Sequence, residues 1–425
     1  MPTTTVVKPS AMAVRVNRVR DLAYVPLSMV LWAALFQVWE FAAARMFGDR
    51  AVASVAAAAV FPIAALPIYT RLAVGFGPTI IQILSLAAVV QAVPGMMPFA
   101  GLQTLVAGLV GASRVAQPTG RGSIVRAGLW SGAASAAVFG IIAIWTWPGP
   151  GVLAGVAASL VGGALSGAIV LAMSPGIERL LGHVTSLTLL EALSYDHPLM
   201  RELMTRAPGT FLHSTNLGVL CDVAARAVGA DALIARVGAL YHDVGKTVTP
   251  EEFAENQRGD ANTVVSTRER ARVLIAHVTN GVALVLAHGL GDRIADFVRE
   301  HHGTSEMRSL VDRGGHDADP PAAPLRYPGP RPRSRETGIL MIADQIEATA
   351  RSRTPQTLEE SLALARMTVD RLVAEEQLVH SGLADDELDE IEFTLAKVLH
   401  AIHHRRVGYP PALEPTPARL RAVKR

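Results

Sequence analysis

The sequence predicts an all-α protein in two parts, a polytopic bundle of transmembrane helices followed by an all-helical soluble domain. Two observations predict this division. The stretch from Leu22 to Ile177 is apolar and almost uncharged, which is typical of membrane-spanning helices. After Ile177, charges of both signs mix with apolar residues that recur at a helical period of about 3.6 residues. No alternating apolar and polar pattern competes with this periodicity, so we expect no strands.

The apolar part divides into several spans. Its few charged residues lie between long apolar runs: Glu40, Arg45, Asp49, Arg50, Arg71, Arg114, Arg121 and Arg126. Because a span needs about 20 apolar residues, we place a transmembrane region at residues 24–176. It holds six predicted spans, near residues 26–46, 51–70, 73–93, 95–113, 127–147 and 152–174. Pro94 and Pro98 interrupt one long uncharged stretch, so a count of five spans stays open.

Basic residues predict the orientation of these spans. A short basic tail, residues 1–23, precedes the first span, and Arg114, Arg121 and Arg126 lie between the fourth and the fifth. Since basic loops stay on the cytoplasmic side, both segments are expected there. Six spans then place the soluble domain in the cytoplasm, as part of a multi-pass protein of the cell membrane, whereas five would contradict this. The first span is too long and starts too late for a cleaved signal sequence.

Overall composition excludes some function classes. The net charge of +2 averages a membrane part with basic loops and a nearly balanced soluble part, so it gives no case for a nucleic-acid polymer as partner. The single cysteine, Cys221, rules out an intramolecular disulfide and a cysteine metal cage. We expect Cys221 to be a core residue.

The soluble part reads as a series of helices. Apolar periodicity predicts them at residues 198–205, 214–227, 231–241, 268–287, 293–301, 337–352, 357–376 and 385–403. Six prolines between Gly314 and Pro332 predict a loop there, and residues 411–425 form a basic tail that we expect to be disordered.

Residue types that bind metal ions are concentrated in these helices. They are His213, the pair His242 and Asp243, His277, the pair His301 and His302, and Asp344. Imidazole and carboxylate ligands suit first-row divalent metals such as Fe, Mn, Co or Zn. The His-Asp pair follows a buried apolar run, and Gly245 permits close backbone approach beside it.

These residues lie in a long series of motifs that resembles a known family, the HD superfamily of phosphohydrolases. The resemblance is closest to the seven-transmembrane HD phosphodiesterases that hydrolyse cyclic di-AMP. The matching blocks run from about Ser186 to Pro410: residues 197–200, 207–210 with 213–214, 235–239, 242–246, 255–257, 277–278, 300–304, 326–330, 343–344 with 347–348, and 404–405 with 409–410. They occur in the family's order and at about its spacing.

The resemblance implies a metal-dependent HD phosphohydrolase domain at residues 186–410, with two divalent transition-metal ions, Mn or Fe, as cofactors. It implies that one ion is bound by His213, His242, Asp243 and Asp344. The second would be bound by His277, His301 and His302, with Asp243 as the bridge between the two. Such a pair activates water for attack on phosphorus, here to open the cyclic dinucleotide to its linear form.

Residues on the substrate side receive separate predictions. Lys246 is expected to contact a phosphate next to the catalytic Asp243. Arg326 and Tyr327 would clamp a phosphate or stack on a base, or they belong to a rigid Pro-Gly turn packed on the domain. Glu347 would be a hydrogen-bond partner of a ligating histidine, or a member of a surface ion pair.

Departures from the family pattern keep the substrate open. Residues 258–262 and 307–310 differ from the family's usual strings, and a short basic tail stands where the family has a further span and a large extracellular domain. The alternatives are a phosphohydrolase of another cyclic dinucleotide or nucleotide, and a non-catalytic nucleotide-sensing receptor; a transporter fits less well. The spans would serve as a membrane anchor, a homodimerisation surface or a small-ligand sensor.

Overall fold

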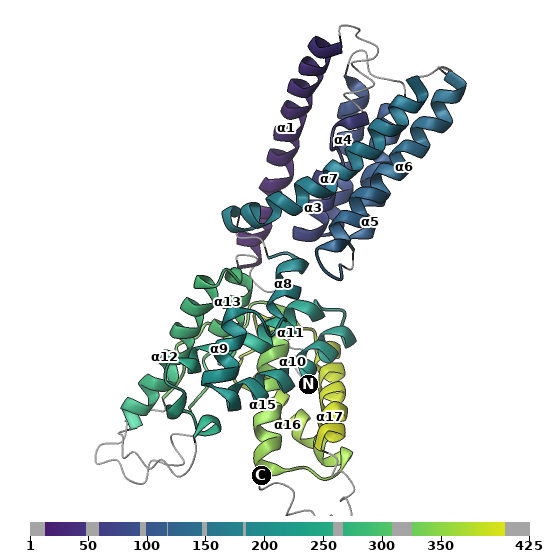
Figure 1. Cartoon of the computed structure of the whole chain (residues 1–425). Coiled ribbons are helices and arrows are strands. Elements are labelled where there is room, and N and C mark those ends of the chain that lie inside the picture. Colours follow the sequence, from purple (N-terminus) through teal and green to yellow (C-terminus); the bar gives the residue numbers. More distant parts are fainter. Residues whose placement is uncertain are drawn as a thin grey trace, which may run out of the picture.

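The helices of the protein are stacked in two bodies (Figure 1), which we call the membrane half, up to Leu181, and the soluble half, from Val184 onward, after the sequence prediction. The computed structural model describes residues 13–47, 59–93, 99–116, 118–146, 151–181, 184–257, 267–307 and 325–403. Within these ranges the only extended pairing is a single antiparallel bridge between Glu306 and Arg326. The all-α prediction is therefore confirmed.

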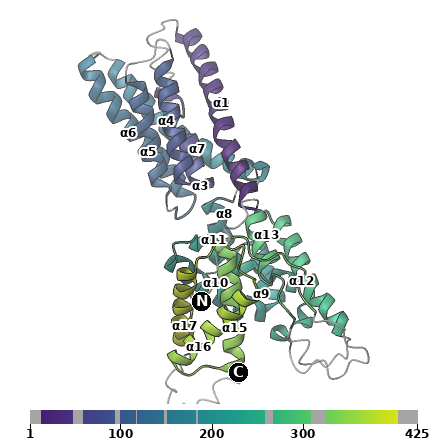
Figure 2. The ribbon, with the colours of Figure 1, turned by 180° about the vertical axis from the view of Figure 1, so that it is seen from behind.

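The membrane half contains one long helix at its edge and a bundle beside it (Figures 1 and 2). Its elements are α1 (Ala13–Phe47), α3 (Ala65–Ala73), α4 (Phe76–Ala92), α5 (Ala100–Arg114), α6 (Gly122–Thr146) and α7 (Gly151–Leu181). Three of them, α1, α6 and α7, are long and apolar enough to cross a membrane. Helices α4 and α5, with 17 and 15 residues, are shorter than the usual span of about 20.

The predicted spans match these helices unevenly. The first half of the second span falls on residues outside the described ranges, and α3 supplies only nine helical residues near its end. Helix α1 begins at Ala13, so residues 13–23 of the predicted basic tail are helical. The count of six spans stays a prediction.

Small residues bring α6 and α7 together. A Cβ added to Gly163 would lie 2.2 Å from the Cα of Gly132, and one added to Gly128 would lie 2.6 Å from the Gly163 carbonyl oxygen. Glycines four residues apart on each helix are typical of close helix packing in membranes. Next to this contact, the buried Gln103 amide donates hydrogen bonds to Ser135 (2.9 Å) and Ser159 (3.0 Å).

The soluble half begins with α8, which lies at the end of this half nearest the membrane half (Figure 1). Its α-helices are α8 (Ser186–Ala192), α9 (Pro198–Arg206), α10 (Pro208–Ala227), α11 (Ala232–Tyr241), α12 (Thr267–Ala287), α13 (Gly291–Glu300), α15 (Arg335–Arg353), α16 (Leu358–Ala374) and α17 (Asp385–His403). Three short 3-10 helices follow α11: η1 (Val244–Thr247), η2 (Pro250–Glu252) and η3 (Ala254–Asn256).

Two features of this half differ from the expectation. Helix α10 begins at Pro208, six residues early, so His213 lies within a helix, and Pro208 occupies a first-turn position that proline tolerates. Helix α12 is also long and apolar enough to cross a membrane. We assign it to the soluble half because charged residues fill its first turn and it packs against η1 and α13.

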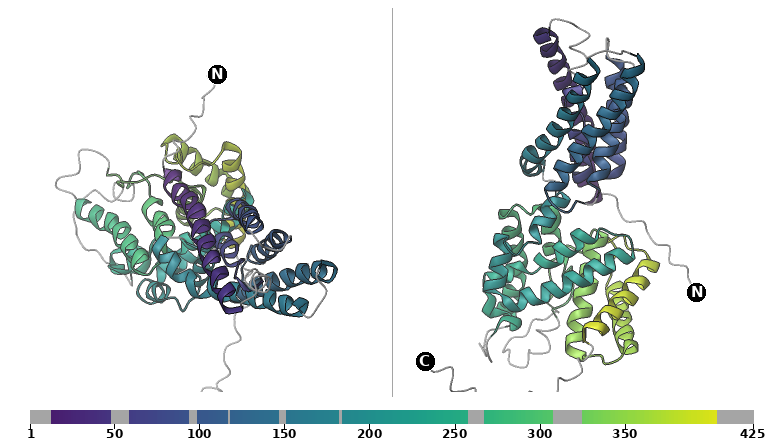
Figure 3. Two further views of the ribbon diagram at one scale, coloured as in Figure 1. Left: turned by 90° about the horizontal axis from the view of Figure 1, so that it is seen from above. Right: turned by 45° about the vertical axis from the view of Figure 1, so that its right-hand side comes forward.

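A single apolar core holds the soluble helices together. Helices α10, α11 and α15 lie at its centre, with fully buried Leu217, Tyr241 and Ile342 among its members. Cys221 is fully buried in the same core, as predicted. The membrane and soluble bodies meet at a narrow waist at the end of α7, which the right-hand view of Figure 3 shows.

Candidate metal centre

The His242-Asp243 pair directly follows the last residue of α11, at the edge of the apolar core. Asp231 starts this helix by accepting a hydrogen bond from the Ile234 amide (3.2 Å), and nearly all later residues of the helix are buried. After Tyr241 the chain tightens into η1, which keeps both members of the pair buried.

Gly245 brings this turn against α12. A Cβ at Gly245 would lie 1.8 Å from the His277 carbonyl oxygen and 2.5 Å from the Gly281 nitrogen, so no other residue fits without backbone movement. The close approach predicted from sequence is confirmed. It places Asp243 within reach of His277.

Two groups of ligand-type side chains gather around Asp243. Asp243, His277, His301 and His302 form one group, and His213, His242 and Asp344 form the other. In each group the ligand atoms lie within 4.8 Å of one another. All seven residues singled out from sequence as metal ligands are thus brought together. Three of them lie on α10, α12 and α15, and the other four directly follow the last residues of α11 and α13.

The two oxygens of Asp243 face different groups. Oδ1 lies 3.3 Å from His277 Nε2 and 3.6 Å from His301 Nε2. Oδ2 lies 3.3 Å from His242 Nε2 and 4.0 Å from His213 Nε2. A carboxylate in this position has one oxygen available to each of two neighbouring cations.

Backbone carbonyls fix the ring orientation of three histidines. The Nδ1 atoms of His242, His277 and His301 lie 2.5–2.8 Å from the carbonyl oxygens of Ala239, Leu274 and Val298, each three residues earlier. Because a carbonyl only accepts, each Nδ1 carries the proton and each Nε2 presents a lone pair. This is the usual arrangement of a metal-binding histidine.

Two of the lone pairs that converge on the centre have no protein donor. Both His242 Nε2 and Asp243 Oδ1 are buried and lack a hydrogen-bond partner among the described residues. A buried acceptor left this way is costly unless a cation or water satisfies it. The donor set thus fits divalent cations.

The charge states of the ligands agree with this fit. Burial alone would raise the pKa of Asp243, but nearby Lys246 and His242 hold it well below its usual value, so the side chain is a carboxylate. Burial lowers the pKa of His301 and of His302, which favours neutral imidazoles. Neutral imidazole and carboxylate are the forms that bind metals.

His213 differs from the other histidines. Its Nε2 lies 3.2 Å from Asp344 Oδ1 and its Nδ1 lies 3.2 Å from Glu347 Oε2. Burial lowers the pKa of His213, but these two carboxylates outweigh burial and raise it to about 10. Glu347 also pairs with Arg351 at 2.6 Å, so it contacts both a candidate ligand histidine and an arginine.

Lys246 lies between two carboxylates. Its Nζ is 2.6 Å from Asp243 Oδ2 and 2.8 Å from Glu255 Oε1. Burial opposes its charge, but Asp243 and Glu255 raise its pKa, so it stays an ammonium. Sequence reasoning gave Glu255 no role although it lay in a matching block. The same segment supports α10, because Asn256 Oδ1 accepts from the Gly209 and Thr210 amides (2.9 and 3.2 Å).

Arg326 and Tyr327 are placed differently from each other. The Tyr327 ring stacks on His302, with centroids 4.0 Å apart and planes at 24°, and it packs against buried Met307. Arg326 is exposed and donates to the Thr304 carbonyl at 3.2 Å. Tyr327 therefore forms a wall of the metal centre, whereas Arg326 supports the turn.

The fold and this ligand set agree with a known protein family. A comparison with protein families matches residues 210–349 to the HD domain. Residues 210–349 are an HD domain. An HD domain implies divalent-metal binding, and the match spans the stretch that holds all seven ligand-type residues.

Relatives of this HD domain have been described in bacteria. The chain is 34% identical over 256 residues to the cyclic-di-AMP phosphodiesterase PgpH of Bacillus subtilis, which covers 60% of this chain and 36% of that protein. It is 31% identical over 239 residues to PgpH of Listeria monocytogenes, covering 56% and 33%. The chain thus spans about a third of the length of these relatives.

A solved structure is also similar. The HD domain of L. monocytogenes PgpH in complex with cyclic-di-AMP is 29% identical to this chain, with a TM-score of 0.46. The similarity covers 50% of this chain and 100% of that one.

Proposed function

We propose that this chain is a membrane-anchored, metal-dependent phosphodiesterase that opens cyclic di-AMP to the linear dinucleotide with two divalent ions, Mn or Fe. The observation that carries the proposal is the position of Asp243, whose two oxygens face two separate ligand groups. A domain that only senses a nucleotide has less need of seven converging ligands.

In this proposal His213, His242 and Asp344 hold one ion, His277, His301 and His302 hold the other, and Asp243 bridges them. Bound ions would lower the pKa of water and offset charge on the phosphoryl oxygens. Lys246 keeps its proton beside Asp243 and is positioned to bind a phosphate oxygen of the substrate. Tyr327 presents its ring next to His302 and would exclude water from one side of the centre.

Membrane placement is supported by α1, α6 and α7, which have the length and composition of spans. We propose a multi-pass arrangement with the HD domain, residues 186–410, in the cytoplasm, because the basic residues at and between the adjoining ends of α5 and α6 favour that side. Arg121, in this basic segment, pairs with Glu191 of the soluble half at 2.6 Å, which supports placing both on one side of the membrane.

Cyclic di-AMP is proposed because the relatives named above act on it. The test uses the full-length protein in lipid nanodiscs, stripped of metal and reloaded with Mn²⁺ or Fe²⁺. It is offered cyclic di-AMP, cyclic di-GMP or guanosine polyphosphates, and the products are separated by chromatography. We expect metal-dependent formation of the linear adenine dinucleotide.

A matched pair of variants completes the test. Asp243→Asn should abolish hydrolysis, and Asp222→Asn, on α10 and paired with Arg226, should not. Hydrolysis of a different nucleotide would replace the substrate assignment. The absence of metal-dependent hydrolysis of every nucleotide would contradict the enzyme assignment.

A further inference from the structure

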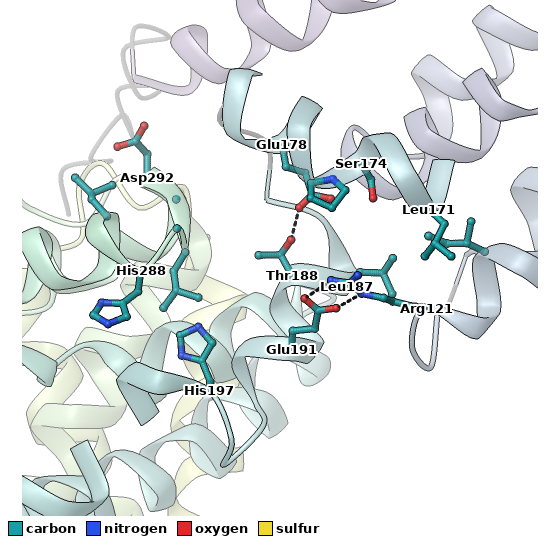
Figure 4. Close-up of a pocket in the computed structure, with 16 residues that line it drawn as sticks. Arg121, Leu171, Ser174, Glu178, Leu187, Thr188, Glu191, His197, His288 and Asp292 are labelled. Atoms are coloured by element: carbon teal, nitrogen blue, oxygen red, sulfur yellow. Dashed lines mark hydrogen bonds and ion pairs between the residues drawn. The ribbon is translucent and has the colours of Figure 1, made fainter. Parts of the chain in front are cut away.

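A cavity of about 440 Å³ lies at the waist between the two halves (Figure 4). Its walls come from the start of α6, the end of α7, α8, and the turn between α12 and α13. This volume is within the range of small-molecule sites, roughly 300–1,000 Å³. The cavity is distinct from the metal centre, because none of the seven ligand-type residues lines it.

Three carboxylates line this cavity: Glu178, Glu191 and Asp292. The basic residues of the lining are Arg121, His197 and His288, and Asp292 also lies 3.7 Å from Arg299. Glu191 is neutralised by Arg121, with contacts of 2.6 and 3.2 Å. Glu178 accepts hydrogen bonds from Thr188 (2.6 Å) and Thr185 (3.0 Å), but no ion-pair partner of Glu178 is found among the described side chains. The cavity wall at Glu178 thus favours a cation that donates hydrogen bonds.

The opposite side of the cavity has different chemistry. Glu191 occupies only Nε and Nη2 of Arg121, which leaves the Nη1 donors for an anionic oxygen. Ile124 and Leu171, from the two membrane helices, add an apolar surface beside it. Together these walls complement a ligand with an ammonium, a phosphate and an apolar extension.

We propose that the cavity binds the headgroup of an aminophospholipid such as phosphatidylethanolamine. The ammonium lies beside Glu178 on the side of Asp292, the phosphate contacts Arg121, and the start of the acyl region packs on Leu171. A choline headgroup fits less well because its nitrogen has no N–H to donate. The inference rests on the proposed placement of α6 and α7 in a membrane, since a lipid reaches the waist from the bilayer.

The cavity wall is connected to the metal centre through α8. Glu191 lies on α8, and the carbonyl oxygen of Ala192, at the end of this helix, accepts the hydroxyl of Tyr241 at 2.7 Å. Tyr241 is fully buried and directly precedes His242. Lipid that fixes α8 therefore also restrains the end of α11.

The test measures lipid retained by the full-length protein. The protein is reconstituted in nanodiscs with equal dioleoyl-phosphatidylethanolamine and dioleoyl-phosphatidylcholine, transferred to mild detergent, and examined by native mass spectrometry without metal or nucleotide. We expect the ethanolamine lipid to be retained about tenfold over the choline lipid, because one charge-assisted hydrogen bond gives at least this factor. Glu178→Gln should remove most of the preference.

A second cavity variant and a control variant complete this test. Asp292→Asn, at the more exposed wall, should weaken the preference even if Glu178→Gln perturbs the start of α8. Asp370→Asn, an exposed carboxylate on α16, should leave it unchanged. Equal retention of the two lipids, or a preference unchanged in both cavity variants, would overturn the proposal. Free phosphoethanolamine binding as tightly as the lipid would overturn the lipid assignment.

This readout does not depend on hydrolysis. If the lipid preference holds and no nucleotide is cleaved, the proposed enzymatic function fails and the lipid site stands. If cleavage occurs and the preference is absent, only the lipid site fails.

Discussion

Replacing Gly245 by alanine should separate the two sides of the metal centre. The added Cβ would lie 1.8 Å from the His277 carbonyl oxygen, so η1 and α12 must move apart by about 1.6 Å to reach an ordinary contact of 3.4 Å. The 3.3 Å distance between Asp243 Oδ1 and His277 Nε2 would then lengthen beyond what one cation can bridge. Overpacking of this kind costs about 1–3 kcal/mol of stability.

The measurements are the metal content and the free energy of unfolding of the full-length protein. Gly245→Ala should lose the ion held by His277 and its neighbours, and its unfolding midpoint should fall. Gly218→Ala, on α10, is the matched control, because a Cβ there would meet its nearest atoms, on Arg236 and Leu240 of α11, at an ordinary 3.5 Å, and alanine favours a helix. If Gly245→Ala keeps full metal content and stability while Gly218→Ala behaves as expected, the close approach is not what positions Asp243.

Three other predictions follow from the same geometry. Lys246→Met should lower kcat for cyclic di-AMP by about 10²-fold with metal content retained, because an ammonium next to Asp243 is lost; unchanged kcat would exclude the phosphate contact. Tyr327→Ala should reduce activity and metal retention because its ring stacks on His302, whereas Arg326→Ala should change neither by more than about threefold; the reverse order would refute the assigned positions. Metal affinity should rise about tenfold per pH unit from pH 7 to 9, because His213, with a pKa of about 10 before metal binds, must release its proton; calorimetry showing no proton release would contradict this.

Helix positions in the soluble half could be predicted from sequence because apolar residues recur there at helical spacing. The predicted ranges 198–205 and 231–241 differ from α9 and α11 by a residue at one end. Helix α8 was missed because its seven residues are too few for a periodic pattern. The start of α10 was placed late because Pro208 and Gly209 interrupt the apolar pattern, whereas Asn256, far along the chain, accepts hydrogen bonds from the amides of Gly209 and Thr210 in the first turn.

The ligand residues could be found from their types and from the family resemblance, but their contacts could not. Sequence placed Arg326 and Tyr327 together, yet only Tyr327 reaches the centre, because the bridge at Glu306 and Arg326 turns alternate side chains to opposite sides. The pairing of Lys246 with Glu255 also depends on the fold of η1 to η3. In the membrane half, apolar composition does not mark helix ends, which left the span count open.

The most direct test of the central claim is the number of metal ions bound by the full-length protein with and without Asp243. Elemental analysis should find about two Mn per chain in the unaltered protein and close to none in Asp243→Ala, since one side chain serves both groups. His302→Ala, which removes a ligand of only one group, should keep about one ion. Two ions per chain in Asp243→Ala would contradict the bridging role.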